Sequence, residues 1–225
     1  MTVKTACFPA VAEHADLLSA SGDGVIGHPH EHAMAEISAW ITRQMARQAE
    51  CSVIMVCTGN SRRSILGATM GNIAAATLDL PVRFFSGGTT PSAFNPRTIR
   101  ALQAIGVQIT ATVEQAAEGT AEEPNPRYLI RWGAGEQSFA IEFSKTYDDP
   151  ANPQHDFAAV MVCTDAEQNC PLVLGATLRV GMPFEDPKEF DGQPIEAEQY
   201  AARRDEIGRV LFQTLQRVRR PMAAP

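Results

Sequence analysis

The chain has 225 residues, of which 44% are hydrophobic and 20% are charged, and its formal net charge at pH 7 is -7. This composition predicts a globular protein of one domain plus additions, and the acidic balance argues against nucleic-acid binding through a basic surface. No apolar run approaches the length of a membrane span, and residues 1–20 lack the basic start and apolar stretch of a secretory signal. We therefore expect a cytoplasmic protein with no membrane partner. Its five cysteines fit a reducing compartment rather than a disulfide framework.

Residues 1–50 precede the first predicted strand and form an N-terminal extension that we expect to pack on the core. Within it, residues 36–50 carry apolar side chains at helical spacing, which predicts a helix leading into that strand. The segment His28-Pro29-His30-Glu31-His32 places three histidines close together. Other ligands are lacking nearby, and Pro29 favours a solvated loop, so we predict no metal site here.

The most informative stretch is the loop after the first predicted strand. Residues 53–56 form an apolar run that predicts a buried parallel strand, and apolar residues recur at helical spacing from Ser64 onward. The loop between them begins with Cys57 and ends, after five further residues, with Arg63. Backbone N–H groups at a helix start bind tetrahedral oxyanions such as phosphate or arsenate, and the same field stabilises a thiolate. We therefore predict that Cys57 is a nucleophile and that Arg63 grips two oxygens of the anion.

The other loop residues suit this role. Gly59 permits a tight turn with positive φ, Asn60 tolerates one and can brace the loop, and Ser64 offers its hydroxyl to the thiolate. The alternative is a structural cysteine that packs as a small hydrophobic residue at a strand end. The predicted anion-binding residues are Thr58, Gly59, Asn60, Ser61, Arg62 and Ser64.

This loop resembles the signature of the low-molecular-weight phosphotyrosine phosphatase family, which is a cysteine, five residues, an arginine and a serine. The resemblance spans about residues 51–216. It implies that Cys57 attacks the anion, that Arg63 binds its oxygens, and that Asp186, in the pair Asp186-Pro187, is the general acid that protonates the leaving oxygen. Taken alone, this pair is equally consistent with an ordinary turn.

A second stretch resembles the thioredoxin-coupled arsenate reductases, a branch of the same superfamily. Residues 157–163 predict a strand that ends in Cys163, and Cys170 follows across the polar loop 164–169. In that branch three cysteines act in series. The resemblance implies that Cys57 attacks arsenate, that Cys163 displaces arsenite, and that Cys170 carries the disulfide to the surface, where thioredoxin reduces it.

The residues of this second stretch also allow a buried structural cysteine and an incidental surface cysteine. A zinc site is a poorer alternative, because neither a second cysteine pair nor a nearby histidine completes four ligands. We predict no metal and no bound cofactor.

The sequence departs from both branches at three positions. Arg62 adds a second positive charge beside the predicted anion site. Ala68 stands where related reductases place a carboxylate for potassium, which argues against that ion. Lys188 stands where tyrosine phosphatases generally offer a tyrosine, which argues against phosphotyrosine and for a small oxyanion.

The remaining patterns predict a doubly wound, four-stranded parallel sheet flanked by helices, as in low-molecular-weight phosphatases. We assign residues 1–50 to the extension and 51–219 to the phosphatase-like domain, with a β-hairpin insertion at about 120–150 that shapes substrate access, makes a dimer contact or only decorates an edge. Lys145, at its end, could attract an anion. Further predicted elements are a strand at 82–86, a helix at 97–106, a linker at 114–125, hairpin strands at 128–132 and 138–143, a strand near 178–180 and a helix at 196–217.

In this fold Cys57, Cys163 and Asp186 meet in the crevice above the strand ends. The leading functional hypothesis is an arsenate reductase that uses a relay of Cys57, Cys163 and Cys170. The alternative is a phosphatase that acts on phosphotyrosine or a small phosphomonoester through a phosphorylated Cys57. A third reading is a noncatalytic redox or anion sensor.

Overall fold

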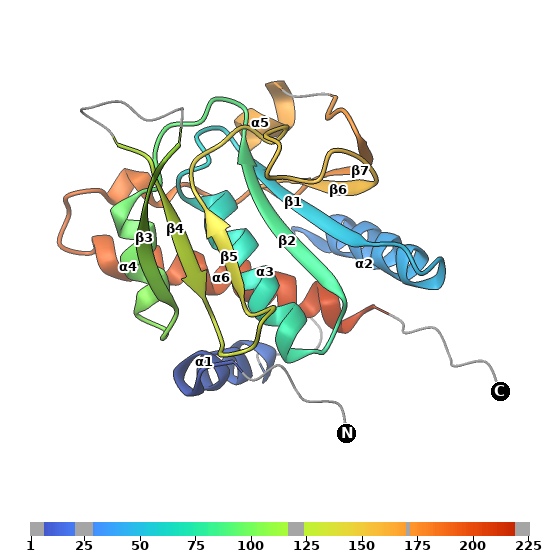
Figure 1. Cartoon of the computed structure of the whole chain (residues 1–225), viewed down its shortest axis with the longest axis horizontal. Coiled ribbons are helices and arrows are strands. Elements are labelled where there is room, and N and C mark those ends of the chain that lie inside the picture. The colour runs from blue at the N-terminus through green and yellow to red at the C-terminus, as the bar shows by residue number, and fades with distance from the viewer. Residues whose placement is uncertain (1–6, 21–28, 117–123, 170–171, 219–225) are drawn as a thin grey trace.

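The computed structural model describes residues 7–20, 29–116, 124–169 and 172–218. Its centre is a parallel sheet with the strand order β2-β1-β6-β7 (Figure 1). The strands are β1 (Cys51–Cys57), β2 (Val82–Gly88), β6 (Phe157–Met161) and β7 (Ala176–Gly181). Because β2 lies on one side of β1 while β6 and β7 lie on the other, the winding reverses at β1. The predicted fold class, a doubly wound four-stranded parallel sheet, is confirmed.

The two central strands, β1 and β6, position the loops that carry Cys57 and Cys163. Every residue of β1 and β6 is buried, as expected for strands covered on both faces. Their register pairs Val56 with Met161, and the N–H of Val162 donates to the carbonyl of Val56 across 2.8 Å. Since the strands are parallel and in this register, Cys57 and Cys163 leave the sheet at the same edge.

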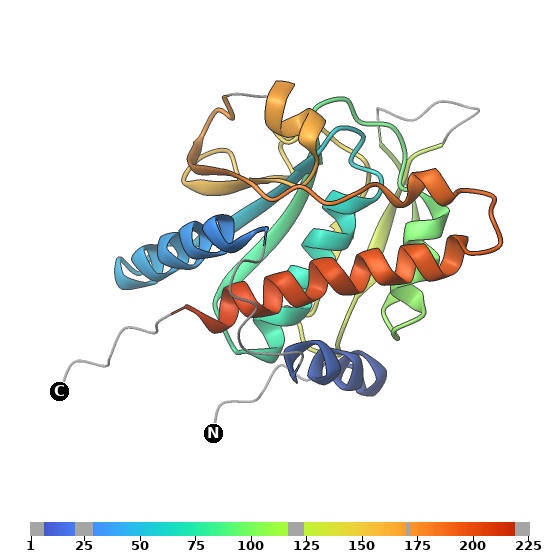
Figure 2. The same ribbon diagram turned by 180° about the vertical axis from the view of Figure 1, so that it is seen from behind.

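The helices that follow these strands cover the sheet. Helix α3 (Arg63–Thr77) is buried from residue 64 to residue 75, and α6 (Glu196–Gln216) packs along it (Figure 2). A side chain at Gly71 would place its Cβ 2.5 Å from the ring of Phe84, so only glycine lets α3 approach β2 this closely. Helix α4 (Pro96–Gln103) begins where Asn95-Pro96 predicts, with the Asn95 side chain accepting from the N–H of Arg97.

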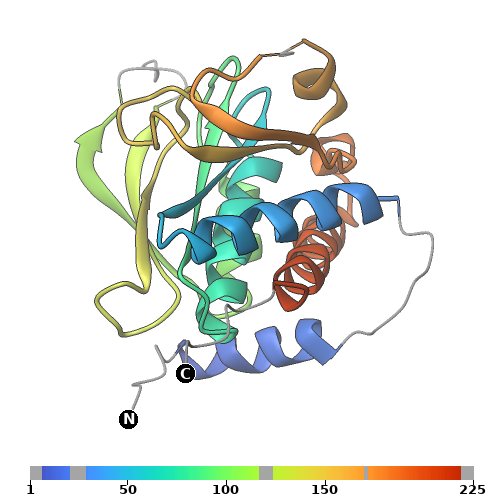
Figure 3. The same cartoon turned by 90° about the vertical axis from the view of Figure 1, so that its right-hand side faces the viewer.

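The N-terminal extension contributes two helices. Helix α2 (Glu31–Ala46) contacts α6 and β7, and it begins and ends earlier than the predicted 36–50 (Figure 3). Helix α1 (Pro9–Ala20), which we did not predict, packs on α6. The expectation of a solvated loop was wrong for His30: it is 7% exposed, and its ring centroid lies 4.7 Å from that of Phe184.

The insertion is a three-stranded antiparallel sheet rather than a bare hairpin. The predicted hairpin is present as β4 (Pro126–Arg131) and β5 (Phe139–Glu142), but β3 (Gln108–Gln115) pairs with β4 on its other side. The predicted linker therefore starts later than residue 114. Most of β3 is exposed, so it lacks the buried alternation that marks a strand in a sequence.

The predicted polar loop 164–169 is a short helix, α5 (Thr164–Asn169), whose pattern is too brief for a helical period to be recognised. In the described part of the chain, no helix has the length and hydropathy needed to cross a bilayer.

Candidate active site

The loop from Cys57 to Arg63 lies at the carboxyl edge of the sheet, between β1 and α3. Its carbonyl groups point away from the centre of the loop, toward neighbouring segments that donate hydrogen bonds to them. These bonds run from Thr89 N to Cys57 O (3.1 Å), from Thr90 N to Thr58 O (2.9 Å), from Ser92 N to Gly59 O (3.1 Å) and from Asn95 N to Ser61 O (3.2 Å). With its carbonyls held this way, the loop leaves its N–H groups for the inner side.

The inner side of the loop has the character of an anion cradle. Within the described residues, the N–H groups of residues 59–62 donate to no protein acceptor. Asn60 adopts a φ of 41°, the left-handed conformation that tightens the curve. Gly88 is needed for this closeness, because a Cβ there would lie 2.5 Å from the carbonyl oxygen of Thr58. Successive N–H groups without protein acceptors, at the start of a helix, attract an anion.

Cys57 sits at the base of the cradle and is held by a buried polar chain. Its Sγ lies 3.1 Å from Ser64 Oγ, and Asn60 Nδ2 donates to that same hydroxyl oxygen across 2.8 Å. The N–H of Lys145 in turn donates to Asn60 Oδ1 across 2.9 Å. Because Ser64 Oγ accepts from Asn60, its own proton is free to point at the sulfur of Cys57.

Arg63 is oriented by the loop that carries Asp186. Its Nη1 donates to the carbonyl of Phe184 across 2.9 Å, and its Nη2 donates to Asp186 Oδ2 across 2.6 Å. The other carboxylate oxygen of Asp186 accepts from the N–H of Lys188 across 3.0 Å, which starts a short 3₁₀ helix at Pro187. The structure thus brings together Cys57, Arg63 and Asp186, as the sequence predicts, although their chemical roles stay predictions.

The side chain of Arg62 points away from the cradle. The second positive charge that we expected beside the anion site is therefore not directed at that site. Its Nε donates to the hydroxyl of Tyr200 across 2.8 Å, and its Nη2 lies 3.2 Å from Asp191 Oδ2. Tyr200 donates to the other oxygen of Asp191. Burial, helped by Asp191, raises the pKa of Tyr200 to about 12. Only the backbone of Arg62 remains a candidate for anion binding, because its charge is compensated by Asp191.

Cys163 lies against the same loop. Its Sγ is 3.5 Å from Thr58 Oγ1, the side chain directly after the nucleophile, and it accepts a hydrogen bond from the N–H of Ala166. Cys163 is 1% exposed and, like Cys57, a free thiol. Cys170, the third cysteine of the predicted relay, lies outside the described residues.

The insertion braces the loop through residues that we did not single out. Ser144 Oγ donates to the carbonyl of Gly59 across 2.8 Å and accepts from the N–H of Ser92. The side chain of Asn125 holds the backbone of Ser144: its Nδ2 donates to the carbonyl of Ser144, and its Oδ1 accepts from the N–H of Ser144. Nothing in the local sequence marks Asn125 or Ser144 as part of a site, because their contacts are with segments far away along the chain.

Lys145 does not attract anions to the mouth of the site, contrary to our expectation. It is 2% exposed, and its Nζ lies 3.0 Å from Glu142 Oε2, which also accepts from Ser86 Oγ across 2.7 Å. A buried cation with a carboxylate partner presents little charge to solvent. Its contribution to the site is instead structural, through the N–H that holds Asn60.

Metal ligands do not cluster in the part of the chain that the structure describes: no group of three His, Cys, Asp or Glu residues there could hold an ion. His32 is exposed on the first turn of α2, whereas His30 faces Phe184. His28 lies outside the described residues.

Fold and site together define a doubly wound parallel α/β protein with a cysteine-to-arginine loop at the carboxyl end of its first strand. No protein-family model matches the chain, and no curated protein matches it.

The chain is similar to several solved structures. One is a low-molecular-weight protein tyrosine phosphatase from T. tengcongensis, with 16% identity, 74% of this chain and 98% of that chain covered, and a TM-score of 0.45. Another is the YwlE arginine phosphatase from Geobacillus stearothermophilus, with 17% identity, 74% and 91% coverage, and a TM-score of 0.43. A third is a thioredoxin-dependent arsenate reductase from Corynebacterium glutamicum, with 16% identity, 92% and 84% coverage, and a TM-score of 0.38.

Proposed function

We propose that the chain is a cysteine-dependent enzyme that acts on a tetrahedral oxyanion. In this proposal the thiolate of Cys57 attacks the central atom, and the guanidinium of Arg63 with the converging N–H groups of the loop holds the anion's oxygens. Support comes from the outward-turned carbonyls, from the Ser64 hydroxyl at 3.1 Å from the sulfur, and from the position of Arg63 at the start of α3. The anion-binding set remains Thr58, Gly59, Asn60, Ser61, Arg62 and Ser64.

Among oxyanion reactions, we propose the reduction of arsenate. The observation that carries this choice is the contact between Cys163 Sγ and Thr58 Oγ1 at 3.5 Å. A hydrolytic phosphatase needs only one thiol, whereas a second free thiol beside the loop suits a disulfide exchange. Both sulfurs are buried, so the first disulfide would form away from solvent.

The proposed reaction has four steps. Cys57 sulfur bonds to arsenic(V), and an oxygen leaves as water after taking a proton from Asp186. Cys163 thiolate then attacks Cys57 sulfur; the S–As bond breaks, its electron pair stays on arsenic, and arsenite leaves as arsenic(III). Cys170 thiolate attacks Cys163, which frees Cys57 and leaves a Cys163–Cys170 disulfide. A dithiol protein of the thioredoxin class supplies the two electrons that reduce it.

The test measures NADPH oxidation by the purified protein with arsenate, thioredoxin and thioredoxin reductase. Wild type should turn over many times, Cys163→Ser should stop at the first step, and Cys7→Ser, which changes a half-buried thiol elsewhere, should behave as wild type. Multiple turnover by Cys170→Ser would show that the three-cysteine relay is wrong. No turnover by wild type with an active thioredoxin system would reject arsenate reduction.

A phosphatase is the second candidate, favoured by the contact between Arg63 and Asp186 at 2.6 Å. In this proposal the carboxyl group of Asp186, held beside Arg63, protonates the leaving oxygen. A phosphatase needs Cys57, Arg63 and Asp186 only, so it should keep full activity on p-nitrophenyl phosphate or phosphotyrosine after Cys163 and Cys170 are both replaced by serine. Robust turnover of either oxyanion would exclude the noncatalytic sensor.

A further inference from the structure

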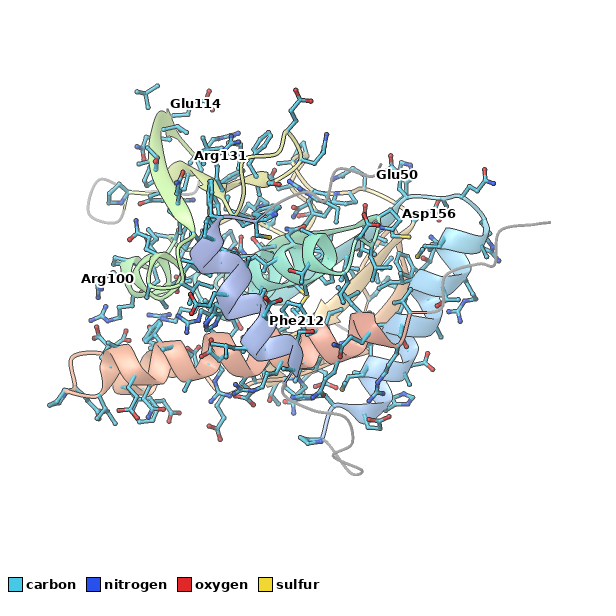
Figure 4. The ribbon with its side chains drawn as sticks, turned by 90° about the horizontal axis from the view of Figure 1, so that it is seen from below. Glu50, Arg100, Glu114, Arg131, Asp156 and Phe212 are labelled. Atoms are coloured by element: carbon cyan, nitrogen blue, oxygen red, sulfur yellow. The ribbon has the colours of Figure 1, made fainter. Side chains whose placement is uncertain are left out.

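A cavity of about 650 Å³ lies at the amino end of the parallel sheet. Its walls come from the first residues of β1 and β2, the end of α3 and the turn between β4 and β5. Figure 4 views the molecule from this end, where Glu50 leads into β1 and Arg131 ends β4. The volume is in the range of small-molecule sites. The full length of β1, roughly 20 Å at 3.3 Å per residue, separates it from the loop of Cys57.

Two polar groups beside this cavity have no hydrogen-bond partner within the described residues: Trp132 Nε1 and Ser138 Oγ. Both residues line the cavity, and their exposed fractions are 2% and 0%. Buried indole N–H and hydroxyl groups nearly always have partners, because leaving them without one costs stability. Two such groups at one cavity indicate that hydrogen-bond acceptors belong there.

A cation accompanies these donors. Arg83 lines the cavity, its guanidinium carbon lies 5.2 Å from the ring centroid of Trp132, and it donates to the carbonyls of Gln137 and Phe139. Arg83 is in none of the ion pairs of the described part of the chain; burial lowers its pKa, and the charge of Glu142 acts against this shift. Glu50 also lines the cavity, but it is exposed, so water and salt screen its charge.

The rest of the lining is mainly small and apolar, which suits a hydrocarbon or aromatic body. The apolar residues include Ala75, Ala76, Leu80, Pro81, Val82 and Phe85. One unpaired guanidinium matches the single charge and planar fork of a carboxylate better than the double charge of a phosphate ester.

We propose that this cavity binds a small organic carboxylate with a flat apolar body, whose oxygens accept hydrogen bonds from Arg83, Trp132 and Ser138. The site is independent of the proposed oxyanion chemistry, since none of its residues belongs to the loop of Cys57. Trp132 Nε1 and Ser138 Oγ are covered by protein atoms in the structure, so this binding requires that both atoms become exposed to the cavity.

The test is isothermal titration calorimetry on the full chain in phosphate buffer, so that phosphate occupies any anion cradle at Cys57. Phenylacetate is the probe, with neutral phenylacetamide and dianionic benzylphosphonate for comparison. Wild type should bind phenylacetate at least about tenfold more tightly than either, because a charge-assisted pair is lost or mismatched in both. Arg83→Gln should weaken phenylacetate binding about tenfold or more, and Arg131→Gln, at the end of β4 and outside the cavity lining, should not.

Arg83→Gln also removes hydrogen bonds to two carbonyls, so Trp132→Phe is the second variant: it keeps an aromatic ring and loses the N–H donor together with part of the ring area. It should weaken binding about three- to tenfold. Absence of phenylacetate binding, equal binding of the amide, preference for the phosphonate, or unchanged affinity in both folded variants would each overturn the proposal.

Discussion

The guanidinium of Arg63 and the carboxylate of Asp186 face each other at 2.6 Å, with Arg63 also anchored on the carbonyl of Phe184. An arginine that grips an oxyanion and an aspartate that donates a proton to it would have to share this contact. In the proposed chemistry a bound anion and Asp186 would therefore compete for the same guanidinium, and the anion would release the acid toward the leaving oxygen.

This competition predicts opposite effects of Asp186→Asn on two measured quantities. The turnover number should fall about 10²- to 10⁴-fold, because the general acid is lost. Inhibition by inorganic phosphate should tighten about three- to tenfold, because Arg63 no longer has a carboxylate partner. Glu185→Gln, which changes the adjacent exposed carboxylate, is the matched control and should alter neither. Weaker phosphate inhibition in Asp186→Asn would contradict the competition.

Asn60 should contribute to stability in two separable ways, through its backbone conformation and through its side-chain bridge. Asn60→Ala should lower the free energy of unfolding by about 2–4 kcal/mol, since two buried hydrogen bonds are lost and alanine is strained at positive φ. Asn60→Gly should cost about 1 kcal/mol less, because glycine accepts that φ. Urea unfolding measures both.

Both Asn60 variants should also slow alkylation of Cys57 by iodoacetamide to a similar extent, because each frees Ser64 from its place beside the sulfur. Alkylation that slows only in the alanine variant would show that the bridge to Ser64 does not position the thiol.

Removing one charge of the buried pair Glu142 and Lys145 should destabilise the protein more than replacing both residues by apolar ones. Glu142→Gln should destabilise the protein by about 3–5 kcal/mol, because it leaves a buried ammonium without its counter-charge. The double change Glu142→Leu with Lys145→Met should cost less than the single change, since both charges leave the interior together. Guanidinium unfolding gives the values; a double variant less stable than Glu142→Gln would refute this account.

The pair of Asp205 and His14 predicts a loss of stability in acid. Burial acts to raise the pKa of Asp205, but hydrogen bonds from His14 and Arg204 outweigh it and lower the pKa to about 2. A carboxyl with a lowered pKa in the folded state adds stability above its unfolded pKa, near 3.8, and loses it as the pH falls toward 2. The contribution is about 2 kcal/mol at neutral pH.

Asp205→Asn removes this contribution, so its stability difference from wild type should shrink between pH 4 and pH 2 when both are unfolded by urea. Asp156→Asn, on the turn before β6, controls for the loss of an acidic residue. A difference that stays constant over this range would show that the ion pair between α1 and α6 is not the source.

The sequence by itself determined the four-stranded parallel sheet and which residues form the loop after its first strand. An apolar run followed by Cys57, a turn with Gly59 and Asn60, and a helical period from Ser64 are local signals, because strand burial, positive φ and helix capping depend on near neighbours in the chain. The same holds for Asn95-Pro96 at the start of α4 and for the hairpin strands β4 and β5. The missed elements, α1, β3 and α5, are short or exposed and lack a strong period.

Only the tertiary structure decided how the loop is held and which charges reach it. Ser144 and Asn125 brace the carbonyl side, Asp191 and Tyr200 draw Arg62 away, and Glu142 buries the charge of Lys145. Except for Glu142 and Lys145, which are three residues apart, these partners lie far from one another along the chain and carry no pattern of their own. Hydrogen bonds and ion pairs depend on distances of about 3 Å, which a sequence does not encode until the chain has folded.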